Sequence, residues 1–398
     1  MKLKEEILSL ENEVIGLRRD FHMHPELGRQ EHRTSQIIES YLQDLGIETT
    51  RIHGTGVVGI LRGAKPGKTI LLRADMDALP ITEENDIPYK SQTEGLMHAC
   101  GHDAHTSMLM VAAKVLAAHK DELCGTVKFV FQPDEEGASD TGAAHMIAGG
   151  VLENPKVDAS FSMHIFAPLQ SGLLGLAPGA TWSEMYSFRI LLKGKGGHTA
   201  APHEAIDPIL CAAAVVQSVQ AIQTREISLR DTTVIMFGTI HGGIANNVIP
   251  DSVELTGSMR YMYDGSDDSP QNPRKRFERM VRSVAEAYRV EAEIDFDIGC
   301  YAVVNDPDFV DFLKNRVLNQ IVEQSAVVPY STMTGEDFSE FLNRNNVPGA
   351  LMFLGTGSKE LGTDYPQHSP KFNINEKDLV TGVEVFVRTA MEFLKGTN

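Results

Sequence analysis

The middle of the chain constrains the fold most, because its order of elements differs from that on either side. Strand and helix patterns follow one another as β-α-β-β-α-β, beginning near residues 184, 208, 232, 252, 274 and 290. In the strands, apolar side chains alternate with polar ones, and Asp207 before Pro208 is typical of a helix start. This order is that of the ferredoxin-like split unit. We therefore predict an α+β domain over residues 184–297.

The flanking segments instead alternate helices with short apolar strands. Helix patterns cover 5–20, 34–46, 103–119, 306–325, 334–345 and 376–395, and strand patterns cover 69–75, 126–132, 157–165 and 350–355. Such alternation indicates a mostly parallel sheet covered by helices. The prediction is an α/β catalytic domain formed by residues 1–183 and 298–398. The ferredoxin-like α+β domain is inserted into it as a lid.

Composition excludes several classes of function. The 398 residues suffice for two domains, and a formal charge of −18 argues against binding to nucleic acid or to anionic membranes. No apolar run reaches the ~20 residues of a membrane-spanning helix, and the first residues lack the apolar stretch of a signal peptide. The four cysteines are too scattered for a disulfide framework. We expect a cytoplasmic protein.

Side chains that bind metals or protons gather where predicted strands end or a helix begins. They are Asp75, Asp77, Cys100, His102, Glu135, Glu136 and His164. Each is unremarkable alone, since a strand-end histidine is usually a core residue and a glutamate pair is usually solvated. In a parallel sheet, however, the carboxyl ends of the strands face one crevice. We therefore expect these side chains to meet there.

The residue types suit metal-dependent hydrolysis. Side chains of successive residues diverge, so one glutamate of the Glu135-Glu136 pair can bind a metal while the other takes a proton from water. A cysteine just before a helix is favoured as a thiolate by the positive end of that helix. Asp75 and Asp77 would orient ligands by hydrogen bonds from behind.

Eight stretches, in this order along nearly the whole chain, carry a resemblance to a known family. They are RRDFHMHPELGRQEHRTS, RADMDALPI, HACGHDAHTSML, FQPDEEG, GKGGHTAAPHEAIDP, GGIANNVIPDSVELTGSMR, GEDFS and HSPKF. Together they resemble the aminoacylase, hippurate hydrolase and auxin-conjugate hydrolase branch of the two-metal peptidases and amidohydrolases. The chain departs from that pattern at Asp134, where the branch more often has alanine, and in TGEDF, where serine often precedes the core.

The resemblance implies a centre with two divalent metal ions per subunit. Cys100 is similar to the ligand that bridges the two ions. Glu136 and His368 resemble the remaining ligands of one ion, and His102 and His164 those of the other. Histidine and thiolate favour zinc, whereas carboxylates also admit manganese, cobalt or nickel. We expect zinc or manganese first.

The resemblance also implies the reaction, which is hydrolysis of the amide bond of an N-acyl amino acid by a metal-bound water. Glu135 matches the general base, and His198 and Asn247 match groups near the scissile carbonyl, where His198 would stabilise the oxyanion. Arg260 would bind the substrate carboxylate, since a guanidinium pairs with it bidentately. A homodimer through the lid domain is compatible with this pattern, and whether His198 serves a neighbouring subunit stays open.

Two other functions are kept as alternatives. One is a dipeptidase or carboxypeptidase with the same two-metal site, which would take a short peptide. The other is a metal-binding protein without turnover, although a structural zinc site needs no base beside it. Four other histidines of these motifs match no ligand position: His22 and His24 are expected to be structural, and His98 and His105 to support the ligands or the packing.

Overall fold

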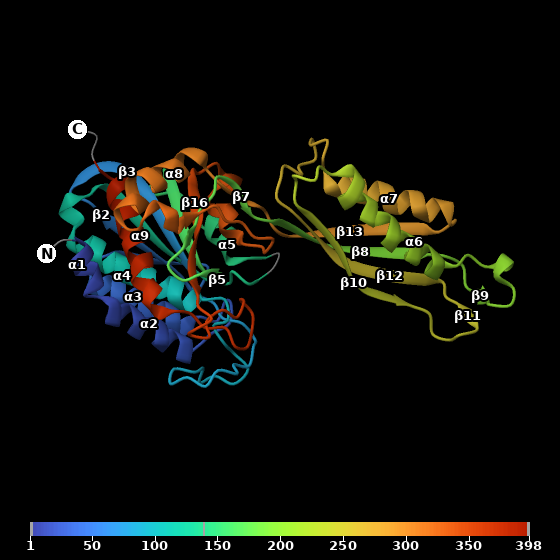
Figure 1. Cartoon of the computed structure of the whole chain (residues 1–398), viewed down its shortest axis with the longest axis horizontal. Coiled ribbons are helices and arrows are strands. Elements are labelled where there is room, and N and C mark those ends of the chain that lie inside the picture. Colours follow the sequence, from blue (N-terminus) through green and yellow to red (C-terminus); the bar gives the residue numbers. More distant parts are fainter. Residues whose placement is uncertain (1–2, 138–139, 396–398) are drawn as a thin grey trace. The chain divides into compact units, whose positions relative to one another are not determined.

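The computed structural model describes residues 3–137 and 140–395, and these divide into two compact units (Figure 1). Unit 1 runs up to Thr181 and includes Val303–Ser331 and the residues from Glu336 onward. Unit 2 comprises Trp182–Ala302 and Thr332–Gly335. Each unit has its own cluster of buried apolar side chains, so each has a hydrophobic core of its own.

The core of unit 1 is a sheet that has eight strands within the described residues, in the order β1-β2-β4-β3-β5-β16-β6-β15. The strands are β1 (Glu48–Ile52), β2 (Gly56–Arg62), β3 (Lys65–Asp75), β4 (Cys124–Gln132), β5 (Ala159–Gln170), β6 (Leu174–Gly175), β15 (Val327–Val328) and β16 (Gly349–Gly357). β3 pairs in parallel with β4 and β5, and β5 pairs in parallel with β16. The carboxyl ends of these central strands therefore lie at one edge, as predicted.

Helices cover this sheet (Figure 1). They are α1 (Leu3–Leu8), α2 (Glu11–Met23), α3 (His32–Asp44), α4 (His102–Ala118), α5 (Gly142–Ala148), α8 (Pro307–Phe312) and α9 (Leu379–Phe393). α4 is buried almost throughout, because α2 and α9 pack against it and it also contacts β3 and β5. A helix buried on all sides is apolar around its circumference. This packing fixes its first residue, His102, at the sheet edge.

Three predicted helices differ from the structure. The helix expected at 5–20 is divided at Ser9–Leu10, and the one at 306–325 continues from α8 only as π and 3₁₀ turns. The α-helix predicted at 334–345 is wrong, since the segment holds the 3₁₀ turns Asp337–Phe341 and Asn343–Asn345. There Glu336 accepts a hydrogen bond from the N–H of Phe338, and Asp337 binds buried polar groups. These side-chain bonds replace regular helical ones.

Unit 2 has the predicted ferredoxin-like order. Its elements are β8 (Glu184–Lys193), α6 (Pro208–Ala221), β10 (Thr233–Gly242), β12 (Ser252–Tyr261), α7 (Pro273–Ala287) and β13 (Glu291–Cys300). The strands form an antiparallel sheet in the order β10-β12-β8-β13, with α6 and α7 on one face (Figure 1). The Asp207 side chain accepts a hydrogen bond from the N–H of Ile209, which confirms the predicted helix start.

Four short strands complete the two units. β9 (Gly197–His198) pairs with β11 (Val248–Ile249) in unit 2, and β7 (Gly179–Trp182) pairs with β14 (Val303–Asn305). In the part of the chain that the structure describes, no helix has the length and apolar character needed to cross a lipid bilayer.

Candidate metal centre

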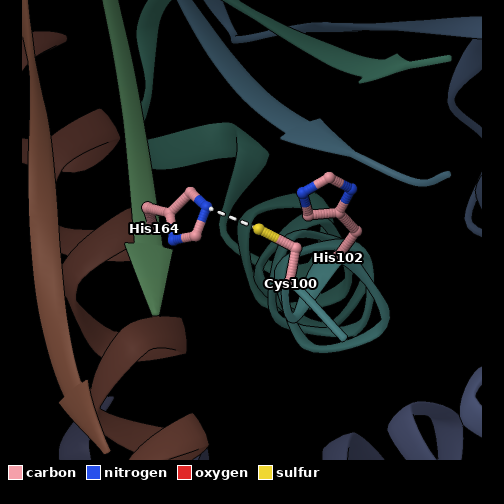
Figure 2. Close-up of side chains that lie close together, drawn as sticks. All are labelled: Cys100, His102 and His164. Carbon is pink, nitrogen blue, oxygen red and sulfur yellow. Dashed lines mark hydrogen bonds between the residues drawn. The ribbon is translucent and has the colours of Figure 1, made fainter. Parts of the chain in front are cut away.

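Cys100 and His102 enter the same space because of the turn that precedes α4 (Figure 2). Between them, Gly101 has a left-handed backbone, with φ 99°, and a Cβ atom there would lie 2.4 Å from the Ile165 side chain. Only glycine adopts this left-handed backbone readily and also leaves room for the Ile165 side chain. The turn directs the thiol of Cys100 toward His164 on β5, whose Nε2 lies 3.5 Å from Sγ.

Cys100 belongs to two groups of potential ligands. Its Sγ and the ring nitrogens of His102 and His164 lie within 4.8 Å of one another. The same Sγ lies within 4.8 Å of ligand atoms of Glu136 and His368, which also approach each other, with Nε2 of His368 at 3.0 Å from Oε1 of Glu136. A single sulfur atom that belongs to both sets is suited to bridge a pair of metal ions.

The two buried imidazoles each use Nδ1 in a hydrogen bond to a backbone carbonyl. His102 donates from Nδ1 to the Asp77 carbonyl at 2.9 Å, and Asp77 Oδ1 lies 3.1 Å from the same nitrogen. His164 donates from Nδ1 to the Ile165 carbonyl at 2.6 Å. In a neutral ring the proton is then on Nδ1 and the lone pair on Nε2, the form that binds metals. Nε2 of His102 is buried and has no hydrogen-bond partner among the residues that the structure describes, which fits a metal ligand.

The electrostatics of the cluster favour a cation. Burial, and then the carboxylates of Glu136 and Glu135, raise the pKa of the Cys100 thiol well above its usual range. Burial lowers the pKa of His102, but Asp75 and Asp77 outweigh it and raise that pKa to about 10. The shift of the His102 pKa, and part of that of the Cys100 pKa, reflects the negative charge around these residues. The residues present therefore fit divalent metal ions.

Glu135 lies beside the two ligand groups. Its Oε2 is 3.9 Å from Nε2 of His102, and its side chain is only 10% exposed. Burial, and then the charge of Glu336, raise the pKa of Glu135 well above its ordinary value. A carboxylate at this position can accept a proton from a molecule held by the cluster, as a general base must. This position suits proton transfer at the edge of the cluster.

Asp77 and Asp75 form a layer behind the ligands. Besides orienting His102, Asp77 accepts a hydrogen bond from the N–H of Glu136 at 3.0 Å. Asp75 lies 2.5 Å from Nδ1 of His105, whose Nε2 accepts from the N–H of Ile165. Both aspartates thus contact groups that position ligands, rather than joining the two ligand groups themselves.

Sequence reasoning gave no role to three buried residues of this layer. Arg73 on β3 contacts Asp75 at 2.6 Å, and Glu336 and Asp337 at 2.9 Å each. Carboxylate oxygens of Glu135, Glu336 and Asp337 lie within 4.8 Å of one another, so this arginine neutralises a dense acidic region. The GEDFS stretch was the signal for Glu336 and Asp337, and the RADMDALPI stretch was the signal for Arg73.

The other histidines of these motifs lie outside both ligand groups. His22 binds Asp103 at 2.7 Å and Glu83 at 3.2 Å, in a buried network that includes Arg18. His98 is buried and its ring nitrogens have no hydrogen-bond partner within the described part of the chain, while His24 is partly exposed.

Unit 2 carries the three remaining predicted residues. His198 and Asn247 lie on adjacent segments, because His198 pairs with Val248 and the N–H of Thr199 donates to the Asn247 carbonyl. Both are exposed. Arg260 on β12 is partly buried, and its guanidinium donates to the Met333 carbonyl at 2.9 Å. Arg260 pairs with Met185 at the start of β8, whereas His198 comes after the end of β8 in the sequence.

A buried carboxyl group beside a cysteine shared by two groups of potential ligands, at the edge of a mostly parallel sheet, is typical of a class of protein, the metal-dependent hydrolases. The model of peptidase family M20/M25/M40 matches residues 71–392. The chain belongs to this family and is a hydrolase that acts on amide bonds.

Relatives of this family are similar over nearly the full length. Thermostable carboxypeptidase 1 of Saccharolobus solfataricus is 38% identical over 397 residues, which covers 98% of each chain. IAA-amino acid hydrolase ILR1-like 5 of Arabidopsis thaliana is 36% identical over 386 residues, covering 96% of this chain and 86% of the relative. The crystal structure of the Bacillus subtilis YXEP protein, described as a dinuclear metal-binding peptidase, superimposes with a TM-score of 0.84 at 30% identity and covers 98% and 99% of the two chains.

Proposed function

We propose that this protein hydrolyses the amide bond of N-acyl amino acids with two divalent metal ions per subunit. The observation that carries the proposal is the presence of Cys100 in both ligand groups, with Glu135 beside them. Cys100, His102 and His164 would hold one ion, and Cys100, Glu136 and His368 the other. Zinc or manganese suits this mixture of thiolate, imidazole and carboxylate, and cobalt or nickel would also bind.

Bound divalent ions would supply Lewis-acid activation of the attacking water and of the carbonyl. Glu135 would take the proton of that water and later return it to the departing amine, which its place at the edge of the cluster supports. Asp77 keeps His102 in the tautomer that leaves Nε2 available. Asp75 acts indirectly, through its contact with His105.

His198 is suited to stabilise the oxyanion. Its Nδ1 accepts a hydrogen bond from the N–H of Ala200 at 3.0 Å, so a neutral ring carries its proton on Nε2. An exposed N–H of this kind can donate to the oxygen on which negative charge develops. Asn247, on the adjacent segment, would assist at the same carbonyl. Arg260 would bind the carboxylate of the substrate.

A carboxypeptidase or dipeptidase activity on short peptides is the second candidate, favoured by the 38% identity with a carboxypeptidase. The two activities need the same ligands and base and differ only in the acyl group. A panel of acetyl, benzoyl, indolyl-acyl and long-chain acyl amino acids, assayed against dipeptides with defined metals, separates them. The proposal expects higher kcat/KM for an acyl amino acid than for every dipeptide. The opposite order would favour the peptidase.

We further propose a homodimer through unit 2. Arg260 and His198 lie near opposite ends of β8, because Arg260 pairs with Met185 and His198 follows Lys193, and these two β8 residues are eight positions apart, roughly 26 Å in a strand. One small substrate cannot contact both side chains of the same unit. His198 and Asn247 would therefore act on substrate bound by the partner subunit. The edge strand β10 also exposes Met236 and Ile240, which a second copy would cover.

Mixing two inactive variants tests this exchange. Glu135→Gln and His198→Ala subunits, allowed to exchange, form mixed dimers in which one site has an intact Glu135 and receives an intact His198. Activity should return on mixing if His198 acts on the partner's substrate. Mixtures that stay inactive although exchange has occurred would show that His198 serves its own subunit.

We also propose a cytoplasmic location. All four cysteines lie in the described part of the chain and none is in a disulfide. Reduced thiols, including the one proposed as a ligand, persist in a reducing compartment.

A further inference from the structure

The loop after β4 carries both Glu135 and Glu136, and its direction is set at Asp134. Asp134 has a left-handed backbone with φ 53°, which is uncommon for a residue other than glycine. Its N–H donates to Oε1 of Glu31 at 2.9 Å. Two residues later, the N–H of Glu136 donates to Asp77. The turn at Asp134 therefore decides where the two glutamates point.

The Asp134 carboxylate lies in a space that two glycines leave open. A Cβ atom on Gly28 would lie 2.1 Å from Oδ1, and one on Gly137 would lie 2.8 Å from either oxygen. Either side chain would displace the carboxylate. The Asp134 side chain is accordingly only 12% exposed, although the residue lies in a loop.

Arg29 binds this carboxylate from the opposite side. Its Nε lies 2.5 Å from Oδ2 of Asp134, and one of its terminal nitrogens lies 2.8 Å from Oδ2 of Asp140. Arg29 is itself left-handed, with φ 64°. Two non-glycine residues in this conformation are thus joined by an ion pair. Such a conformation is costly and persists only where its surroundings fix it, often at active sites.

We propose that Asp134 is a positioning residue for the general base. The Arg29–Asp134 ion pair keeps residues 133–137 in the turn that directs Glu135 and Glu136 toward the ligand cluster. The kinetic part of this inference rests on the proposed function. Its structural part, the conformation of the loop, does not.

Kinetics of four variants test the first part. Asp134→Asn keeps the volume between Gly28 and Gly137 and removes the charge, and Arg29→Ala removes the other partner. Each should lower kcat by about 10- to 100-fold, because a small displacement of a catalytic group is costly, with KM changed less than about twofold. The double variant should lose no more kcat than the more impaired of the two single variants, since both substitutions remove the same interaction. Arg29→Lys should restore part of kcat.

Arg33→Ala is the matched control. Arg33 is 37% exposed, against 44% for Arg29, and pairs with Asp20 at 2.9 Å without contacting the loop. It should leave kcat unchanged. Unchanged kcat in Asp134→Asn and Arg29→Ala, or additive losses in the double variant, would overturn the proposal. A loss confined to kcat is diagnostic, because an ion pair that only stabilised the fold would not act on kcat alone.

Hydrogen exchange tests the loop without any substrate. A peptide covering residues 131–137 should exchange its amides faster in Asp134→Asn and Arg29→Ala than in the wild type, and at the wild-type rate in Arg33→Ala. Exchange unaffected by both loop variants would overturn the inference. If the wild type hydrolyses no amide, the proposed function fails, while this measurement still decides whether the ion pair holds the loop.

Discussion

His105 connects Asp75 on β3 to the backbone of β5, the strand that carries His164. Its Nδ1 lies 2.5 Å from Oδ1 of Asp75, and its Nε2 accepts a hydrogen bond from the N–H of Ile165 at 2.8 Å. Because an acceptor nitrogen carries no proton, the ring donates from Nδ1 to the carboxylate. Burial lowers the pKa of His105, which is consistent with this neutral form. The His105 ring thus fixes the Asp75 carboxylate, which lies behind His102, relative to β5, the strand that carries His164.

Replacing His105 should weaken metal binding without removing a ligand. His105→Ala leaves the Asp75 oxygen and the Ile165 N–H unpaired, so the affinity for the metals should fall by about 10- to 100-fold, as for other groups behind a ligand. Competition with a chelator measures this. His24→Ala, at a partly exposed histidine outside both ligand groups, is the control. Unchanged affinity in His105→Ala would show that the connection is dispensable.

Arg73 should be intolerant of a conservative replacement. Lysine keeps the charge but cannot reach Asp75, Glu336 and Asp337 together, and it leaves buried carboxylates without a partner. We expect Arg73→Lys to lower the free energy of unfolding of unit 1 by about 3 kcal/mol. Urea denaturation followed by circular dichroism measures the change. Arg62→Lys, at an exposed arginine 3.6 Å from Glu48, should have no effect. Equal stability of the two variants would contradict this account.

Asp378 should make stability depend on pH. Burial raises its pKa to about 6, while its side chain accepts a hydrogen bond from Ser171 at 2.7 Å. Since the folded pKa exceeds the unfolded value, the stabilisation is complete below the unfolded pKa and is lost as pH rises through about 6. Between pH 5 and 7.5 the melting temperature of the wild type should therefore fall relative to that of Asp378→Asn. Parallel melting curves across this range would exclude the effect.

Cys100→Ser should lose metal as well as activity. Serine is a poor ligand at neutral pH, and this position belongs to both groups of ligands. The variant should bind fewer than two ions per subunit after equilibration with zinc or manganese and dialysis. Cys211→Ser, at a buried cysteine of unit 2, should retain the wild-type content. Two tightly bound ions in Cys100→Ser would show that Cys100 does not bridge them.

The sequence predicts the parts of this fold that repeat a simple pattern. The apolar runs of β3, β4 and β5 and the alternation in β8 were recognisable, and they fix the edge at which Cys100 and Glu135 meet. β1 and β2 were not predicted, because β1 is largely polar and partly exposed and β2 contains glycines. The pairing partners of side chains could not be predicted either. The contacts of Arg73 with Glu336, and of Arg29 with Asp134, join residues far apart in the chain.

The most direct test of the central claim is amide hydrolysis by metal-loaded Glu135→Gln protein, with metal content measured on the same sample. Glutamine preserves the size of the side chain but cannot accept the proton. The account predicts wild-type metal content, an unchanged melting temperature and a loss of kcat of at least about 100-fold on an N-acyl amino acid. A variant that binds both ions and retains more than a few per cent of wild-type kcat would contradict the role of Glu135 as the base.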